Sequence, residues 1–162
     1  MSSDQPLEFE VGQRLREQKL MFAAAESCTG GLLLHRLTNV PGSSAYVAGG
    51  IVAYSNAAKH SLLGVQEHTL NVFGAVSEQV AAAMARGVRA ALGSQIGIGI
   101  TGIAGPDGGT AEKPVGLTYI GLSTPDFSLV RRFVWEGDRV ANKEASTAAA
   151  LQMLLEYLMS GK

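Results

Sequence analysis

Three short, strongly apolar segments separate longer segments with helical periodicity, and this alternation limits the possible folds more than any other feature. The apolar segments are residues 20–26, 50–54 and 95–101, and each has the length of a buried strand. Buried strands that alternate with helices are typical of α/β domains, in which helices cover both faces of a sheet. The third segment, QIGIGIT, alternates glycine with isoleucine, which indicates a strand that a neighbouring element covers closely.

The segments between these strands carry helix signals. Ser77 and Asp138 are suited to cap the helices that follow them, because their side-chain oxygens accept hydrogen bonds from free backbone N–H groups. Residues 115–122 and 128–135 are predicted as two strands joined by a turn, so that the sheet is mixed. The predicted helices are residues 7–19, 31–40, 56–64, 78–91 and 139–159.

Composition excludes several classes of protein. Hydrophobic residues make up 46% of the 162 residues and charged residues 17%, which excludes a disordered chain. Thirteen basic and fourteen acidic residues give a net charge of −1, so we expect no nucleic-acid partner. A single cysteine, Cys28, excludes an internal disulfide and a multi-cysteine zinc site. The sequence shows neither a secretory signal nor a spanning segment, and we expect a cytoplasmic protein without a membrane partner.

The first polar cluster, AESCTGG at residues 25–31, follows a predicted strand and opens a predicted helix. Such a turn presents free backbone N–H groups and the positive end of a helix, which suit an anion or a developing oxyanion. The alternative is an ordinary helix-capping turn without a ligand. The candidate site residues in this cluster are Ser27, Thr29, Gly30 and Gly31.

The second cluster brings Ser44, Tyr54 and Lys59 into the stretch of residues 41–59. A serine hydroxyl is a weak nucleophile unless a base takes its proton. A lysine with apolar neighbours can lose its proton near neutral pH and serve as that base. The alternative is a solvated lysine whose stem lies along the core.

The third cluster is the glycine-rich stretch of residues 101–116, which is typical of a binding loop. It lacks the patterns of a Walker A loop and of a dinucleotide fingerprint, and a surface loop without function is the alternative. Arg139 opens the last predicted helix, where a cation is favourable only beside a bound anion such as a phosphate; an ordinary surface arginine is the alternative. We predict no metal site, since the three histidines lack ligand spacing. The candidate residues of the third cluster are Thr101, Gly102, Gly105, Gly108 and Gly109.

The three clusters and several shorter motifs follow one another in the order and spacing of a known family. AESCTGG, VPGSS, GGIVAYSNAAK, GAVSEQV, TGIAGPDGG with EKPVG, and GDR resemble the C-terminal domain family of the competence/damage-inducible protein CinA. The stand-alone members of that family are similar to nicotinamide-nucleotide amidohydrolases. The resemblance covers roughly residues 8–158 and implies a single domain over residues 1–162. The implied fold is a three-layer α/β/α arrangement with a mixed, mostly parallel sheet.

The resemblance also implies an activity. It implies hydrolysis of the carboxamide of nicotinamide mononucleotide to nicotinic acid mononucleotide and ammonia, by a serine/lysine pair and without a metal or another cofactor. On this sequence the matching pair is Ser44 and Lys59, with Tyr54 beside them. In this interpretation neutral Lys59 takes the proton of Ser44, and backbone N–H groups stabilise the oxyanion. Further polar positions that match the family's site are Ser27, Thr101 and Arg139, the last as a ligand of the 5′-phosphate.

Ser44 can meet Tyr54 only if the strand between them is short. If residues 46–54 formed one straight strand, Ser44 would lie roughly 30 Å from Tyr54, at about 3.3 Å per residue. The strand must therefore begin near residues 49–50, and the preceding segment must fold back. If it does not, Ser27 is the better nucleophile, because Ser27 also follows a strand end.

Two other functions are compatible with the same pocket. One is a non-catalytic module that binds a nucleotide and regulates a partner, and the other is hydrolysis of a different small amide or ester. In the favoured interpretation the partner is a small molecule, a pyridine mononucleotide. We also expect a homo-oligomer, with alanine-rich helices as its interface. Many members of the family carry a second arginine where this chain has Lys143, which predicts slightly weaker phosphate binding.

Overall fold

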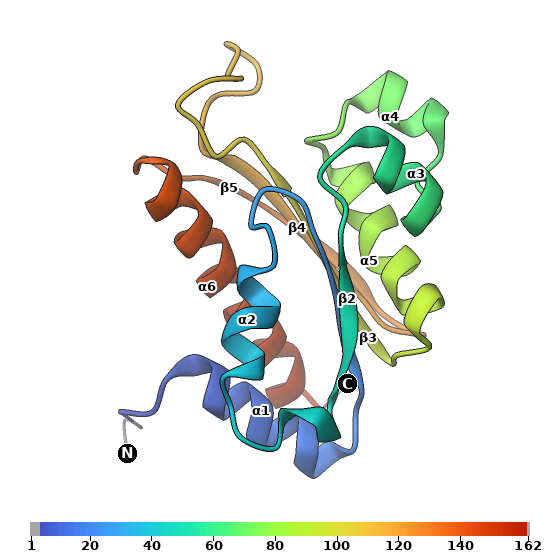
Figure 1. The fold of residues 1–162 in the computed structure, drawn as a ribbon, viewed down its shortest axis with the longest axis vertical. Helices are drawn as coiled ribbons and strands as arrows, with labels where there is room; N and C mark the ends of the chain where they lie inside the picture. The colour runs from blue at the N-terminus through green and yellow to red at the C-terminus, as the bar shows by residue number, and fades with distance from the viewer. Residues whose placement is uncertain (1–3, 162) are drawn as a thin grey trace.

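The computed structural model describes residues 4–161 as a five-stranded sheet between two layers of helices (Figure 1). Helices α1, α2 and α6 lie on one face of the sheet and α3, α4 and α5 on the other. In chain order the elements are α1 (Leu7–Gln18), β1 (Phe22–Glu26), α2 (Leu32–Thr38), the short 3-10 helix η1 (Ser43–Ala45), β2 (Val47–Val52), α3 (Asn56–Leu63), α4 (Glu67–Phe73), α5 (Glu78–Leu92), β3 (Ile96–Gly102), β4 (Leu117–Ser123), β5 (Ser128–Val134) and α6 (Arg139–Met159).

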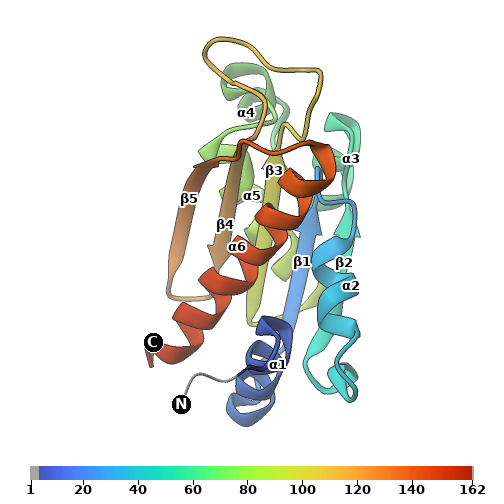
Figure 2. The ribbon, with the colours of Figure 1, turned by 90° about the vertical axis from the view of Figure 1, so that its left-hand side faces the viewer.

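The sheet has the strand order β2-β1-β3-β4-β5. Strand β1 pairs in parallel with both β2 and β3, whereas β3, β4 and β5 pair antiparallel with one another in turn. Two successive antiparallel pairings return β5 to the direction of β3, so only β4 opposes the other strands. Figure 2 shows the strands side by side behind α6 and α2. The predicted three-layer fold with a mixed, mostly parallel sheet is confirmed.

Side chains of the interior strand β1 enter two separate cores. Phe22 and Ala24 belong to the core beneath α1, α2 and α6, whereas Ala23 and Ala25 belong to the core beneath α3, α4 and α5. Successive side chains of a strand point to opposite faces, so the residue after the strand continues this alternation. The isoleucines of β3 are buried in the first core, and α5 covers the glycine side of that strand. A Cβ atom at Gly99 would lie 2.6 Å from the Ala81 carbonyl oxygen, which explains the glycine–isoleucine alternation.

Two parts of the chain differ from the sequence-based expectation. Strand β2 begins at Val47, three residues before the predicted start, because Val47, Gly49 and Gly50 pair with β1. This half of the strand is only half-buried or exposed, so it lacks the apolar pattern of a buried strand. Helix α4 was not predicted, since it is only seven residues long and buries a single side chain, Leu70, so its apolar periodicity is weak. In the described part of the chain, no helix has the length and apolarity needed to cross a membrane.

Candidate functional site

Two buried polar side chains, Ser27 and Lys59, meet where β1 ends. The Lys59 Nζ atom donates a hydrogen bond to the Ser27 Oγ atom at 2.9 Å. Its other acceptors are the backbone carbonyl oxygens of Ala53, at 3.1 Å, and Tyr54, at 3.2 Å. Lys59 is 2% exposed and Ser27 is 6% exposed. The alternative of a solvated lysine is therefore wrong.

The surroundings of Lys59 favour its neutral form. Burial lowers the pKa of its amine below the ordinary value, and the neighbouring Cys28 works slightly in the opposite direction. Among the described residues, no carboxylate forms an ion pair with Lys59. The residue also lies in the first turns of α3, whose positive end disfavours a cation. This is an environment in which a lysine can act as a base.

The parallel pairing of β1 and β2 explains why these residues meet. Both strands end at the same edge of the sheet, where sites of α/β folds are found. Ser27 follows β1 directly, and its amide donates to the Ile100 carbonyl oxygen of β3 at 3.0 Å. After β2, the Ser55 side chain caps α3 by accepting from the Ala58 amide, and Lys59 follows one turn later on the buried side.

The predicted pairing of Ser44 with Lys59 is wrong. Ser44 lies in η1, before β2 begins, and is exposed to solvent. The six residues of β2 separate η1 from the end of the sheet that carries Lys59, a span of roughly 20 Å at about 3.3 Å per residue. The strand starts too early for the preceding segment to fold back onto the site. The alternative that the sequence left open, Ser27, is the serine beside Lys59.

Tyr54 lies at the same edge but does not contact the pair through its hydroxyl group. Its side chain is 65% exposed, and its hydroxyl accepts a hydrogen bond from Arg139 Nη2 at 3.2 Å. Arg139 also donates from Nη1 to the Gly105 carbonyl oxygen at 2.7 Å. The guanidinium thus connects three segments: the end of β2, the glycine-rich loop and the start of α6.

The turn after Ser27 runs through two glycines in left-handed conformation. Gly30 has φ 60° and Gly31 has φ 104°, a region that L side chains rarely adopt. The Gly30 amide donates to the Ser27 carbonyl oxygen at 3.2 Å, which closes the turn. Among residues 4–161, the backbone N–H groups of Thr29 and Gly31 donate to no protein acceptor.

Sequence reasoning missed Glu26, the last residue of β1. Its carboxylate is completely buried and accepts hydrogen bonds from the Thr29 hydroxyl at 2.7 Å and from the amides of Leu33 and Leu34 at 2.9 and 3.2 Å. The Thr29 hydroxyl is therefore engaged inside the protein. An acidic residue at the end of an otherwise apolar strand was the signal available in the sequence, because such a residue is buried only with partners.

The glycine-rich loop of residues 103–116 extends beyond the end of the sheet (Figures 1 and 2). Its start is held by α6, since Asn142 Nδ2 donates to the Ala104 carbonyl oxygen at 3.0 Å. Lys113 Nζ donates to the Phe73 carbonyl oxygen at the end of α4. The Thr101 hydroxyl is buried and donates to the Ala75 carbonyl oxygen at 2.8 Å, so it too is engaged within the protein.

The predicted glycines of this region have close packing neighbours. A Cβ atom at Gly102 would lie 3.1 Å from the Cys28 sulfur atom, on the side of the sheet away from α5. Gly105 and Gly109 allow the two arms of the loop to approach at Val115. Gly108 has φ 93° and lies further out in the loop. These positions shape the loop, and Gly105 alone among them contacts a charged site residue, Arg139.

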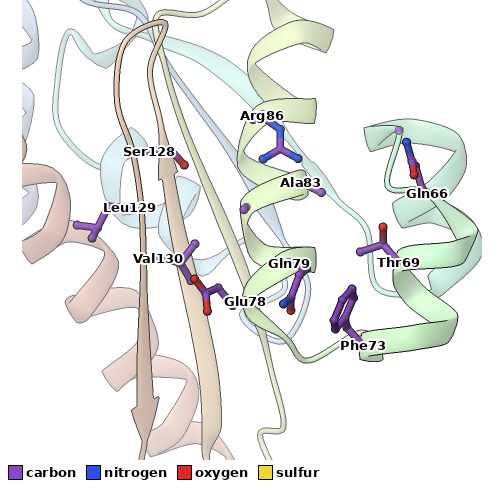
Figure 3. A pocket seen from close by; sticks show the side chains of 12 residues that line it. Gln66, Thr69, Phe73, Glu78, Gln79, Ala83, Arg86, Ser128, Leu129 and Val130 are labelled. Atoms are coloured by element: carbon purple, nitrogen blue, oxygen red, sulfur yellow. The ribbon is translucent and has the colours of Figure 1, made fainter.

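Of two hollows in the surface, one is lined by predicted site residues and the other is not. One of about 400 Å³ lies between the start of α2 and the start of α6 and is lined by Thr29, Gly30, Gly31 and Lys143, among others. Another of about 560 Å³ lies between α4, α5 and β5 and contains none of the predicted site residues (Figure 3). In the described part of the chain, no group of three or more metal-ligating side chains is arranged to hold an ion.

Comparison with known proteins assigns the family. The family profile described as the CinA C-terminal domain matches residues 4–158. The chain belongs to the CinA C-terminal domain family. A CinA-like protein of Chloroherpeton thalassium is 49% identical over 161 residues, which are 97% of this chain and 38% of the relative. The chain thus spans about 38% of the length of the curated relatives that it matches.

Solved structures of the CinA superfamily share the fold. The competence/damage inducible protein CihA from Agrobacterium tumefaciens is 40% identical with a TM-score of 0.88, and the similarity covers 96% of this chain and 98% of that one. A CinA superfamily protein from Klebsiella pneumoniae is 32% identical with a TM-score of 0.92, over 95% of this chain and 96% of that one.

Proposed function

We propose that this CinA domain is an amidohydrolase in which Ser27 is the nucleophile and Lys59 is the general base. The observation that carries the proposal is the 2.9 Å contact between Lys59 Nζ and Ser27 Oγ, with both side chains buried and the pKa of the lysine lowered. When Lys59 is neutral, the Ser27 hydroxyl donates its proton to the free electron pair of the amine. The serine is thereby activated without a histidine.

The substrate that we propose is nicotinamide mononucleotide, on the strength of the family resemblance. Ser27 Oγ attacks the carboxamide carbon while its proton passes to Lys59. The resulting ammonium returns that proton to the departing nitrogen, which leaves as ammonia and gives a nicotinoyl ester on Ser27. Water then attacks the ester carbon, Lys59 takes a proton from the water, and the proton returns to Ser27 Oγ as nicotinic acid mononucleotide leaves.

Two backbone amides are suited to stabilise the oxyanion of this reaction. The N–H groups of Thr29 and Gly31 have no acceptor within the described residues, and they belong to the turn that begins at Ser27. Fixed donors that are directed at a developing negative charge contribute more than donors that must reorient. Arg139 connects the loop and Tyr54 above this edge, and we propose that its remaining N–H groups contact the 5′-phosphate.

The test is ammonia release from nicotinamide mononucleotide by the purified protein, with nicotinic acid mononucleotide identified as the second product. Ser27→Ala removes the nucleophile itself and should lower kcat by at least about 10⁴-fold. Ser44→Ala is the matched control, because Ser44 is an exposed serine at the opposite edge of the sheet, and its kcat should stay within about twofold of wild type. Equal loss in both variants would refute the assignment of the nucleophile.

The same experiment tests the alternative functions. If nicotinamide mononucleotide binds to the wild-type protein without turnover, the domain is a nucleotide-binding module. If a panel of small amides and esters contains a faster substrate, the chemistry stands and the substrate assignment fails. Localisation in the cytoplasm and assembly into a homo-oligomer are also part of the proposal, and size-exclusion chromatography with light scattering tests the assembly.

A further inference from the structure

Glu26 is a buried charged residue that the reaction proposed above does not use. Its side chain is 0% exposed, and it lies in β1, an interior strand of the sheet. Within residues 4–161 it forms no ion pair with a lysine, arginine or histidine. Burying a carboxylate without hydrogen-bond partners is strongly unfavourable, because the group loses its hydration. The structure must therefore compensate it in another way.

Backbone amides of α2 provide this compensation. Helix α2 begins after Gly31, which has no side chain to cap it; the Leu32 amide donates to the Thr29 carbonyl oxygen at 3.1 Å, and the next two amides need another acceptor. The Leu33 amide donates to Glu26 Oε1 at 2.9 Å, and the Leu34 amide donates to Glu26 Oε2 at 3.2 Å. Glu26 therefore caps the start of α2, although it precedes the Leu33 and Leu34 amides by seven and eight residues. The hydroxyl of Thr29 completes its set of donors at 2.7 Å.

All three donors belong to the segment that immediately follows Ser27. The carboxylate contacts this segment in its middle, at Thr29, and at its end, where α2 begins. The two left-handed glycines between these points reverse the chain so that the helix start faces the end of the strand. Without the carboxylate, glycine residues would leave this turn conformationally free, because glycine has the largest backbone freedom of all residues.

The backbone of Glu26 holds the other half of the site. Glu26 is paired with Val52 on one side and with Ile100 on the other. Its carbonyl oxygen accepts from the Ala53 amide at 2.9 Å, and the Ala53 carbonyl oxygen accepts from Lys59 Nζ. One rigid residue is therefore linked to the serine turn through its side chain and to the lysine through its main chain.

We infer that Glu26 is a positioning residue, whose buried carboxylate fixes the turn that carries Ser27 and the free amides of Thr29 and Gly31. This inference rests on the proposed amidohydrolase function. Catalytic groups that are displaced by about 1 Å lose up to about a hundredfold in rate, so a residue that fixes this turn determines kcat without touching the substrate.

The decisive variant is Glu26→Gln, which keeps the size of the side chain but turns one acceptor oxygen into an NH2 group. That group cannot accept from the Leu33 or Leu34 amide, so at least one cap bond is lost. With nicotinamide mononucleotide, kcat per folded molecule should fall by about ten- to a hundredfold, while KM changes by less than about threefold. The acid limb of the pH profile should not move, since that limb reports Lys59.

A matched control separates positioning from loss of stability. Gly93→Ala introduces an L side chain at φ 64° with no neighbour within 4 Å, at the C-terminal end of α5 and at the opposite edge of the sheet. It should destabilise the fold by strain alone and leave kcat at the wild-type value. Thr29→Val is the milder companion, because it removes one of the three donors and keeps the carboxylate; its kcat should lie between those of wild type and Glu26→Gln.

Amide hydrogen exchange supplies a measurement that does not depend on activity. In Glu26→Gln, the amides of Leu33 and Leu34 should exchange about tenfold faster or more, while amides in α5 keep their protection. If wild type has no turnover, the proposed function fails and exchange still decides whether Glu26 fixes the turn. If wild type turns over and Glu26→Gln retains full kcat per folded molecule, or exchange is unchanged, the inference about Glu26 is overturned.

Discussion

At the end of β1, each face of the sheet buries one ionisable side chain, an amine on one face and a carboxylate on the other. On the face of α3 and α5, the buried Lys59 amine is surrounded by oxygen atoms of Ser27, Ala53 and Tyr54. On the face of α2 and α6, the buried Glu26 carboxylate is surrounded by a hydroxyl and two backbone amides. Neither group forms an ion pair among the described residues.

The comparison shows why the two groups have different uses. The donors around Glu26 are mostly backbone N–H groups, which can only donate, so they hold the carboxylate oxygens in place. One partner of Lys59 is a hydroxyl, which accepts from an ammonium and donates to a neutral amine. The contact between Lys59 and Ser27 can pass the proton of the serine to the amine. The contacts of Glu26 instead hold the turn after Ser27 in place. The predictions below test this division, from the largest expected effect to the smallest.

Among the predictions that follow, removal of the Lys59 amine should cause the largest loss of activity. In Lys59→Met, Ser27 keeps its hydroxyl but loses the base, and kcat for nicotinamide mononucleotide should fall by about 10²–10⁴-fold. Single-turnover measurements on folded variant protein, checked by circular dichroism, test this. Activity within tenfold of wild type would show that Ser27 is activated by another group and would end the proposed division.

Cys28 tests the other face. Burial raises the pKa of the Cys28 thiol to about 11, and the nearby Glu26 carboxylate adds to the rise. The thiol is neutral at pH 8, so alkylation by iodoacetamide should be about a hundredfold slower than for an ordinary cysteine, or slower still because the side chain is 6% exposed. The unfolded protein in denaturant is the control. Rapid alkylation of the native protein would contradict the burial and the raised pKa of this thiol.

The pH dependence should follow Lys59. Because burial lowers the pKa of its amine, the neutral base is present down to a lower pH than for an exposed lysine. Activity should therefore fall as pH decreases through this lowered pKa, by about tenfold per pH unit below it.

The same pKa shift affects stability with a defined sign. Between the lowered folded pKa and the ordinary unfolded pKa of Lys59, unfolding takes up a proton, so the free energy of unfolding rises with pH across this window. Below the folded pKa both states are protonated and this contribution is constant. Chemical denaturation of wild type and Lys59→Met over this pH range measures the slope, and equal slopes in both proteins would refute the shift.

Tyr54→Phe should have the smallest effect. The Tyr54 hydroxyl contacts Arg139 and not the serine or the lysine, so its removal should lower kcat by less than about threefold. The lysine keeps the backbone carbonyl oxygen of residue 54 in this variant. A loss larger than about a hundredfold would instead assign the hydroxyl to proton transfer.

Much of the fold could be predicted from local signals. The caps at Ser77 and Asp138, the helical periodicity of α1 and the alternation in β3 are short-range features, and the corresponding elements lie within about two residues of their predicted bounds. Helix α4 and the first half of β2 could not be found in this way. Both are held by contacts with distant segments, and their own patterns are too weak to specify them.

The candidate site likewise has features that local sequence predicts and features that only tertiary contacts determine. The sequence by itself determined that a serine, a lysine and two glycines lie at strand and helix ends, because those positions follow from local patterns along the chain. Only the tertiary structure decided which serine meets Lys59, since the answer depends on where β2 begins and on its parallel pairing with β1. It also decided that Glu26 is buried and caps a helix seven residues away, because the reversal at Gly30 and Gly31 creates that contact. Local sequence determines which side chains lie at the ends of strands and helices, and packing determines which of them are buried and in contact.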